Sequence, residues 1–523
     1  MSETIRSYKP AATLRRHRRP RRRGGRGVLL LLAAIILLAC AVAWFTRDSF
    51  PFERVIPADQ KYSVVLVDIL GNRKAMAGSA VWRALPDMLH PRAVTDALGG
   101  DAPVPDWVLN NLVGETCYVT GNDLNGMSDV LFITRMYRGG RILEALHRFV
   151  PGIVRDEAGG LHLRQLTNGE RDLYYAIRGR LLVLSPSRDM LIRCLTLPRE
   201  EMSDAETVKL ALAQSGSEQV RGIVAPGSDD PLGDVFQHLS FALRLDTSSA
   251  RLKCNGLLRP EYSGPLPALL TNAAPRTLSA PPNGIVEISA NFDCSLKDVC
   301  AGIGKGLQWD QAWTEWQAGL PEKERDNANR LAALLGLLGP EIRLSWRGVD
   351  LNEIVPVPEL VAQFEANPEV VRGFFATLGP PPDSARPWES YPRYDPENGR
   401  VRIPMIGGPS IEPTLGVYGD TLLVSTSATV AGELLATEPV VAELPQPANL
   451  YVRVDPLACA ETCAEVGRLL CEEGLLRGHT IDTFESVASQ WTEKASFIRE
   501  VTAILAKDGE GIAAEVTVRC TGS

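Results

Sequence analysis

The chain has 523 residues, of which 45% are hydrophobic and 23% charged. These values are typical of globular proteins, and the length predicts two or more domains. The formal net charge is −8, although residues 1–27 carry ten basic side chains and one acidic side chain, so the remainder is strongly acidic. An acidic body is a poor electrostatic partner for nucleic acid, and we expect no nucleic-acid binding.

An apolar stretch at 28–45 follows closely on a basic tract at 15–23. A helix of this length reaches about 27 Å, close to the ~30 Å thickness of the hydrocarbon layer. Arginine is costly inside a bilayer, so the basic arm at 1–27 is expected to stay in the cytoplasm. The sequence therefore predicts a single transmembrane helix at 28–46 in the inner membrane, with the bulk of the chain periplasmic or otherwise extracytoplasmic.

A cleaved signal is the alternative. The segment Leu37-Leu38-Ala39-Cys40 resembles a bacterial lipoprotein signal, in which Cys40 would be lipidated after cleavage. Residues 41–45 remain apolar where a lipoprotein usually begins a polar tether, which favours the transmembrane interpretation. Both interpretations attach the same body to a membrane.

Beyond a juxtamembrane linker at 47–60, the sequence predicts a strand at 62–70 and then a helix at 75–89. The same order recurs at 284–292 and 295–307. This is the first of six features that appear twice in the same order.

The clearest repeated feature is a hairpin turn that leads into an apolar strand. Gly179 occupies the first turn and Gly419 the second, and the strands end in Ser185 and Ser425. Each copy also closes with a predicted hairpin. Six matches in one order favour a duplicated unit.

The predicted fold class is α+β, with an N-terminal transmembrane helix followed by two tandem homologous lobes at 61–258 and 284–520. Strands joined by short turns predict mainly antiparallel sheets with helices packed on one side. A Pro-rich linker at 259–283 separates the lobes, and a Pro-rich loop at 379–394 belongs to the second lobe.

This layout, with apolar strands that end in Ser-rich turns (LLVLSPS and LLVSTSA), resembles poorly characterised membrane-anchored proteins of bacterial envelopes. The resemblance concerns architecture across most of the chain. It implies an envelope location and supplies no catalytic residues.

Motifs for catalysis are missing from the sequence. The six histidines include no pair one helical turn apart, which a zinc peptidase needs, and there is no G-x-S-x-G, S-x-x-K or Walker motif. The glycines at 302–306 lack dinucleotide-loop spacing, and the Asp- and Asn-rich segment 123–129 lacks the distal glutamate of a calcium loop. We expect no catalytic residue, no metal and no cofactor.

Nine of the ten cysteines lie beyond the apolar stretch, and this odd number leaves at least one thiol free or paired between chains. Cys294 and Cys300 are close enough in sequence to form a disulfide. Cys459, Cys463 and Cys471 could gather a metal, but their spacing fits no usual zinc pattern. For these three cysteines the favoured interpretation is burial as small apolar side chains. A disulfide is the second interpretation and a metal site the last.

Trp309, Trp313 and Trp316 recur at helical spacing. Such a row could bind sugar rings or a bilayer surface, although packing against the sheet explains three large rings more simply. These tryptophans are the candidate binding residues.

The sequence thus predicts a membrane-anchored extracytoplasmic protein that binds or scaffolds another envelope protein or a cell-wall polymer. The alternative is a membrane-tethered hydrolase whose dispersed active site lies between the lobes, because a dispersed triad leaves no sequence motif.

Overall fold

The structure, a computed structural model, describes the chain with gaps. The main described ranges are 52–72, 106–122, 129–145, 153–158, 161–168, 171–198, 218–227, 232–262, 284–292, 333–351, 356–378, 392–405, 409–438, 448–476 and 480–521. Shorter pieces outside these ranges include 35–37, 279–280 and 440–441, and single residues such as Cys40.

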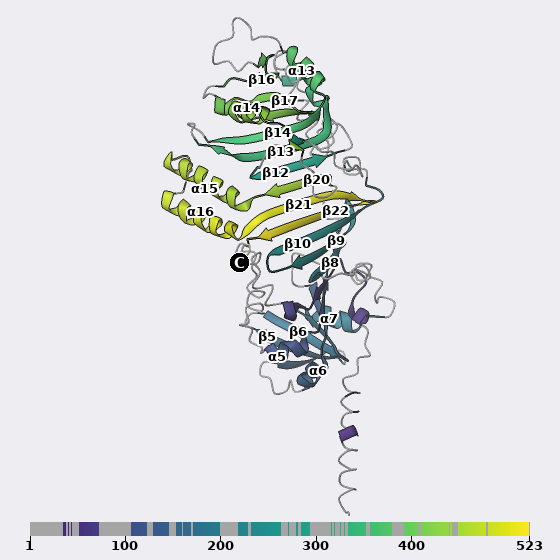
Figure 1. The fold of residues 1–523 in the computed structure, drawn as a ribbon. Coiled ribbons are helices and arrows are strands. Elements are labelled where there is room, and N and C mark those ends of the chain that lie inside the picture. Colours follow the sequence, from purple (N-terminus) through teal and green to yellow (C-terminus); the bar gives the residue numbers. More distant parts are fainter. Residues whose placement is uncertain are drawn as a thin grey trace, which may run out of the picture.

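Within the described residues, twenty strands form one antiparallel sheet (Figure 1). The first half of the sheet contains β1 (Tyr62–Val67), β2 (Thr116–Gly121), β3 (Val130–Arg135), β4 (Ile153–Ala158), β5 (Leu161–Asn168), β6 (Arg171–Arg178), β7 (Leu181–Ser185), β8 (Val220–Val224), β9 (Phe236–Leu245) and β10 (Ser249–Leu258). The second half contains β12 (Val286–Asn291), β13 (Leu338–Asp350), β14 (Val357–Ala366), β15 (Arg393–Asp395), β16 (Arg400–Arg402), β17 (Thr414–Tyr418), β18 (Thr421–Ser425), β20 (Leu450–Val454), β21 (Ile498–Asp508) and β22 (Gly511–Cys520).

The described helices and a small second sheet complete the elements. The helices are η1 (Phe52–Val55), α5 (Asp106–Leu112), α6 (Arg138–Ala145), α7 (Arg188–Leu195), α13 (Pro368–Ala376), η6 (Pro409–Ile411), α14 (Ala428–Leu435), α15 (Pro456–Glu472) and α16 (Ile481–Ser496). The second sheet pairs β11 (Ser279–Ala280) with β19 (Val440–Val441).

The two halves of the large sheet have the same strand order on either side of one junction. Counted outward, the first half runs β10-β9-β8-β1-β2-β3-β7-β6-β5-β4. The second half runs β22-β21-β20-β12-β13-β14-β18-β17-β16-β15. The pair β10–β22 joins them, so one sheet continues through both halves.

The junction has local two-fold symmetry. The hairpins β9–β10 and β21–β22 have turns of the same length, which begin at Asp246 and Asp508. When the two hairpins are aligned at their turns, Lys253 of β10 is equivalent to Glu515 of β22. The same two residues are also direct partners across β10–β22. Antiparallel partners are related by a local two-fold axis, so the axis passes between these two residues. The registers of the strand pairs then assign equivalent positions in the two halves strand by strand.

Helices cover both faces of the outer part of the second half. Val371 and Phe375 of α13 pack against Leu422, while Ala431 of α14 packs against Leu423. Leu422 and Leu423 are neighbours in β18 and therefore point to opposite faces. Burial on both faces explains why this strand reads as a continuous apolar run.

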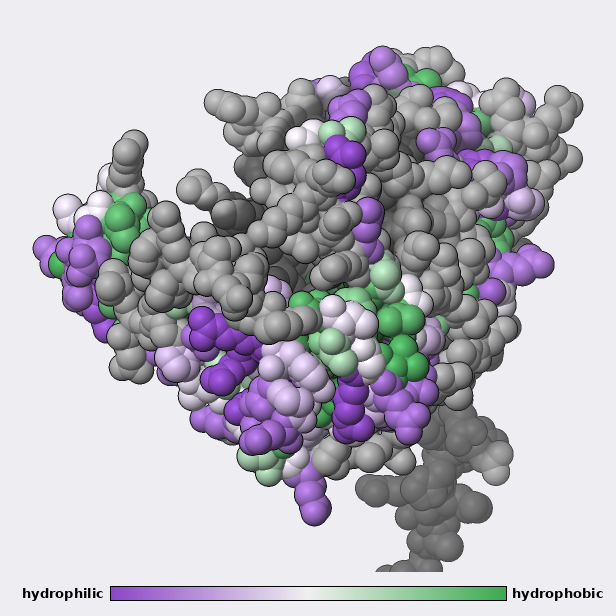
Figure 2. Space-filling view, turned by 90° about the horizontal axis from the view of Figure 1, so that it is seen from above, coloured by the Kyte–Doolittle hydropathy of each residue, from purple (hydrophilic) through white to green (hydrophobic). Residues whose placement is uncertain are grey.

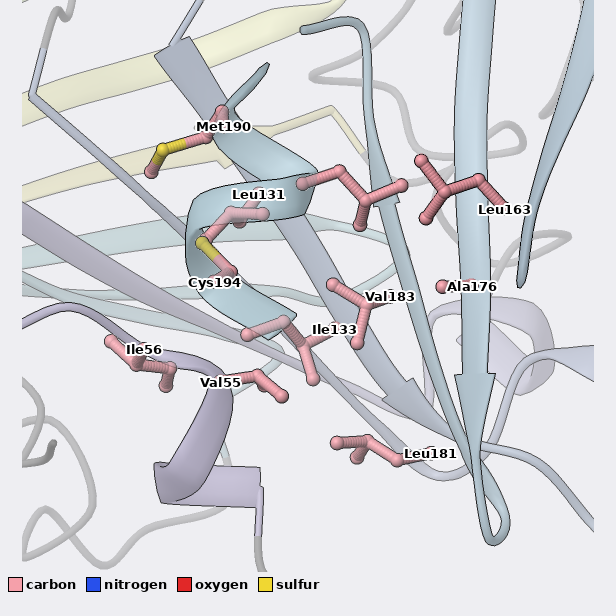
Figure 3. Packing of buried hydrophobic residues seen from close by; sticks show 11 residues of the cluster. Val55, Ile56, Leu131, Ile133, Leu163, Ala176, Leu181, Val183, Met190 and Cys194 are labelled. Carbon is pink, nitrogen blue, oxygen red and sulfur yellow. The ribbon is translucent and has the colours of Figure 1, made fainter. Parts of the chain in front are cut away.

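The core of the first half forms beneath α7. Met190 and Cys194 of α7 lie over Leu131 and Ile133 of β3 and over Val183 of β7 (Figure 3). All five side chains are at most 5% exposed. Burying each of the larger apolar side chains contributes about 1.5–3 kcal/mol, so this cluster stabilises the attachment of α7 to the sheet.

The predicted fold class is wrong in the arrangement of the sheet and its helices. The two halves share one sheet, and helices lie on both faces of its outer strands. Unpaired strand edges are unfavourable, and pairing β10 with β22 removes one edge from each half. The Pro-rich segment at 259–283 indicated a boundary, but it carries no information about this non-local pairing.

The membrane part of the predicted fold class is also not supported. Among the described residues, no helix has the length and apolar character needed to cross a bilayer. Most of the segment 28–46 lies outside the described residues, as does the predicted helix at 75–89. The Pro-rich loop predicted at 379–394 lies mostly outside the described residues, and its end overlaps β15, which begins at Arg393.

The helices α15 and α16 form a hairpin between β20 and β21 that projects from the sheet (Figure 1). The equivalent connection in the first half, β8 to β9, is much shorter. Gly467 allows close approach of the two helices, because a Cβ there would overlap the ring of Phe484. The hairpin is therefore an addition to the second half of the duplicated framework.

Candidate functional site

Trp309, Trp313 and Trp316 lie outside the described residues, as do Cys294 and Cys300. Their roles stay predictions.

Cys40 and the cysteines of α15 are described. Cys40 is an exposed free thiol, and its lipidation stays a prediction. Cys459 and Cys471 are free and half-buried, whereas Cys463 is free and exposed. The favoured interpretation of this group as buried apolar residues is therefore wrong for Cys463. No group of three or more metal-ligating side chains occurs in the described part of the chain.

An apolar groove of about 390 Å³ lies on one face of the second half. Its floor comes from four adjacent strands, β12, β13, β14 and β18, whose residues on this face are Val286, Ile288, Leu344, Trp346, Leu360, Ala362 and Val424. We call this surface the front face. Pro413 and Thr426 also line the groove. Its volume falls within the roughly 300–1,000 Å³ of small-molecule sites.

The groove leaves large apolar side chains in contact with solvent. Leu344 is 43% exposed and Leu360 is 44% exposed. Burial of apolar surface contributes about 25 cal/mol per Å², so a hydrophobic ligand that covered these side chains would bind favourably. Figure 2 shows that the surface seen from above also exposes hydrophobic residues bordered by hydrophilic ones.

Two polar groups at the rim of the groove, on Trp346 and Thr426, have partners within the protein. The indole N–H of Trp346 donates to the carbonyl of Gly348 at 2.7 Å. The hydroxyl of Thr426 accepts the N–H of Leu360 at 3.0 Å and donates to the carbonyl of Pro358 at 2.7 Å. Because these groups are satisfied, a ligand in the groove meets walls that offer mainly apolar contact.

The first half fills the equivalent space with its own side chains. The registers make Tyr62 equivalent to Val286 and Gly121 equivalent to Trp346. Tyr62 is 6% exposed, and a Cβ at Gly121 would lie 2.8 Å from Cζ of its ring. Tyr62 therefore packs directly over the Gly121 backbone. The framework is shared, but only the second half presents this hollow among the described residues.

A second pair of equivalent positions supports this contrast. Val130 of the first half is 3% exposed, whereas its equivalent Leu360 is 44% exposed. Phe132 is equivalent to Ala362, so the first half carries a phenyl ring where the groove has a methyl group. The groove thus results from specific residue differences on a duplicated scaffold.

The opposite face, which we call the back face, differs between the halves in polarity. Ile133 and Tyr118 of the first half are equivalent to Gln363 and Arg343 of the second. Gln363 is 0% exposed, and its side-chain amide has no hydrogen-bond partner among the described residues. Burial lowers the pKa of Arg343, while the carboxylate of Glu341 acts in the opposite direction. At these two positions, polar side chains contribute less to folding than the apolar side chains at the same places in the first half.

The hollow between α15 and α16 is larger, about 680 Å³, but it has charged walls. Its lining includes Glu461, Glu493 and the ion pair between Arg468 and Glu485, whose Nε–Oε1 distance is 3.3 Å. Both members of that pair are about half exposed, so the pair contributes little to stability. The front-face groove is therefore the better candidate for a hydrophobic ligand.

The groove can bind but lacks the groups for common hydrolytic chemistry. Ser345, Ser425 and Thr426 are among its lining residues, but the lining includes no histidine and no carboxylate that could act as a base. The groove residues have no distinctive signal in the sequence, because alternating apolar residues in a strand usually indicate a covered core face. Aligning the two repeats position by position would have highlighted Phe132 against Ala362.

Comparison with known proteins leaves the family open. No protein-family model matches the sequence, and no curated protein matches it. Solved structures with some likeness include crystal form III of TP0453, at 10% identity, covering 41% of this chain and 83% of that chain with a TM-score of 0.25. Crystal form IV of TP0453 has 11% identity, covers 42% of this chain and 84% of that chain, and has a TM-score of 0.24. The resemblance to envelope proteins stays a prediction.

Proposed function

We propose that this protein is a binding module whose front-face groove takes a hydrophobic small molecule, such as a lipid acyl chain. The observation that carries the proposal is the contrast between the two halves of the sheet. In the first half Tyr62 and Phe132 occupy the front-face positions at which the second half has an open groove. Natural proteins rarely leave an apolar hollow exposed without a use for it.

The proposal assigns binding rather than hydrolysis to this site. Residues that line the groove supply apolar contact, and no histidine or carboxylate stands among them. The proposed location is the cell envelope, outside the cytoplasm. It is supported by the sequence alone, in which the basic tract at 15–23 precedes the apolar segment.

Binding of a fluorescent fatty acid to the purified protein tests the groove. We expect saturable 1:1 binding that palmitate displaces. Ala362→Phe introduces the ring that the first half carries as Phe132, and we expect it to weaken binding by at least about tenfold, equivalent to ~1.4 kcal/mol.

A matched substitution controls for general effects on the sheet. Ala503 of β21 lies on the front face outside the groove and is half-buried, so Ala503→Phe should leave fatty-acid binding unchanged. Equal loss in both variants, or unchanged binding in folded Ala362→Phe, would reject the groove as the ligand site.

The first half offers the converse experiment. Phe132→Ala removes the equivalent ring, and in the native protein it should create a second fatty-acid site. In the Ala362→Phe variant the same substitution should raise the binding capacity. Urea unfolding of each variant would establish that the fold is retained before binding is compared.

A further inference from the structure

Two cysteines lie one helical turn apart near the start of α15. Cys459 and Cys463 have the i, i+4 spacing that places side chains on the same helix face. The pair belongs to the helical hairpin that the second half alone has between equivalent strands of the described sheet.

The local structure holds this pair in a fixed geometry. Asp455 caps α15 by accepting the N–H of Ala458 at 3.0 Å, and Pro456 occupies the first turn. Both thiols therefore lie in the first turns of a well-capped helix. A rigid helix positions ligands more accurately than a loop does.

The pair is accessible, unlike the cysteines of the sheet cores. Cys463 is exposed and Cys459 is half-buried, whereas Cys194 is 1% exposed and Cys520 is 7% exposed. Neither thiol of the pair forms a disulfide. An ion or reagent from solvent can therefore reach the pair through Cys463.

The set of donors selects the kind of ion. No third histidine, cysteine or carboxylate joins the pair in the part of the chain that the structure describes. Structural zinc requires four ligands, so two thiols do not suit it. Soft sulfur ligands select Cu(I), which as a closed-shell ion accepts linear coordination by two thiolates.

We propose that Cys459 and Cys463 form a two-coordinate site for a soft monovalent cation of the Cu(I) class. Binding forms two sulfur–metal bonds and releases the thiol protons to solvent. The ion enters and stays as Cu(I), so no electron is transferred.

Anaerobic titration of the full-length protein with Cu(I), in competition with a chromogenic Cu(I) chelator, tests the site. We expect one tight equivalent in the native protein. Cys459→Ser and Cys463→Ser should each weaken that equivalent by more than about 100-fold, beyond the ~10–100-fold typical of a supporting residue.

Cys471→Ser is the matched control, because this thiol lies on the same helix outside the pair. It should leave the tight equivalent unchanged, and far-UV circular dichroism should be the same for all three variants. Loss of the tight equivalent in Cys471→Ser, or its persistence in Cys463→Ser, would overturn the proposal. Isolation of the native protein with Cys459 and Cys463 joined as a disulfide would also overturn it.

Discussion

Lys253 and Glu515 lie directly opposite each other across β10 and β22, and they occupy equivalent positions in the two halves of the sheet. The equivalent strands of the two halves therefore pair around a local two-fold axis, with a basic residue on one strand and an acidic residue on the other. The equivalent strands remove each other's free edge, and this pairing turns two similar halves into one continuous sheet.

Charge reversal at this axis should weaken the junction. Lys253→Glu places two carboxylates directly opposite each other, and like charges at such positions destabilise a sheet. We expect a loss of about 0.2–1 kcal/mol in the free energy of unfolding, measured with urea. Lys253→Gln should show a smaller loss, and an unchanged stability in Lys253→Glu at low salt would argue against this pairing.

The Ser-rich turns of the two halves should contribute similar stability. Ser187 accepts the N–H of Met190 at 3.2 Å, and Ser427 accepts the N–H of Val430 at 3.3 Å, so each serine caps a helix. Ser187→Ala and Ser427→Ala should each cost about 0.5–2 kcal/mol in urea unfolding. Aspartate at either position retains a capping oxygen and should restore most of the stability.

Neighbouring leucines of β18 should both be costly to truncate, although they face different helices. Leu422 packs beneath α13 and Leu423 beneath α14, and both are at most 1% exposed. Leu422→Ala and Leu423→Ala should each cost about 2–5 kcal/mol. Leu360→Ala in the groove is the control, and its smaller effect follows from the 44% exposure of this side chain.

The core thiol Cys194 should make stability depend on alkaline pH. Burial raises its pKa to about 12, while the charge of Arg193 acts in the opposite direction. An unfolded thiol ionises near pH 8.5, so between that pH and about 12 the unfolded state releases a proton that the folded state keeps. Stability from this group is complete below pH 8.5 and falls as pH rises, by about 1.4 kcal/mol per pH unit.

Urea unfolding from pH 8 to pH 11 measures this slope. Cys194→Ala should reduce the slope of the unfolding free energy against pH by the contribution of one thiol. It should also lower the stability at pH 8, because core packing is lost. Identical slopes in the native protein and Cys194→Ala would contradict the assignment. Cys463→Ala, at an exposed position, is the matched control.

The sequence predicted many of the elements and failed on their assembly. The predicted strand at 62–70 contains β1 at Tyr62–Val67, and the predicted strand at 284–292 contains β12 at Val286–Asn291. Such elements depend on local patterns of apolar residues, caps and turns. The pairing of β10 with β22 joins residues that are far apart in the chain, so no local pattern reveals it.

The groove depended on tertiary structure in the same way. A strand with alternating apolar residues looks the same in sequence whether its face is covered or open, and Leu344 was therefore indistinguishable from a core residue. The thiols of α15 illustrate a related limit, since their spacing indicated a shared helix face but their exposure depended on what packs against that face.

Sequence by itself determined the antiparallel character of the strands and the capped turns, because both follow from short-range backbone and side-chain preferences. Only the tertiary structure decided that the halves share one sheet, that helices cover both faces of its outer strands, and that one half is filled where the other is open. These features arise from contacts between distant segments, whose energies depend on shape and burial that no single stretch of sequence contains.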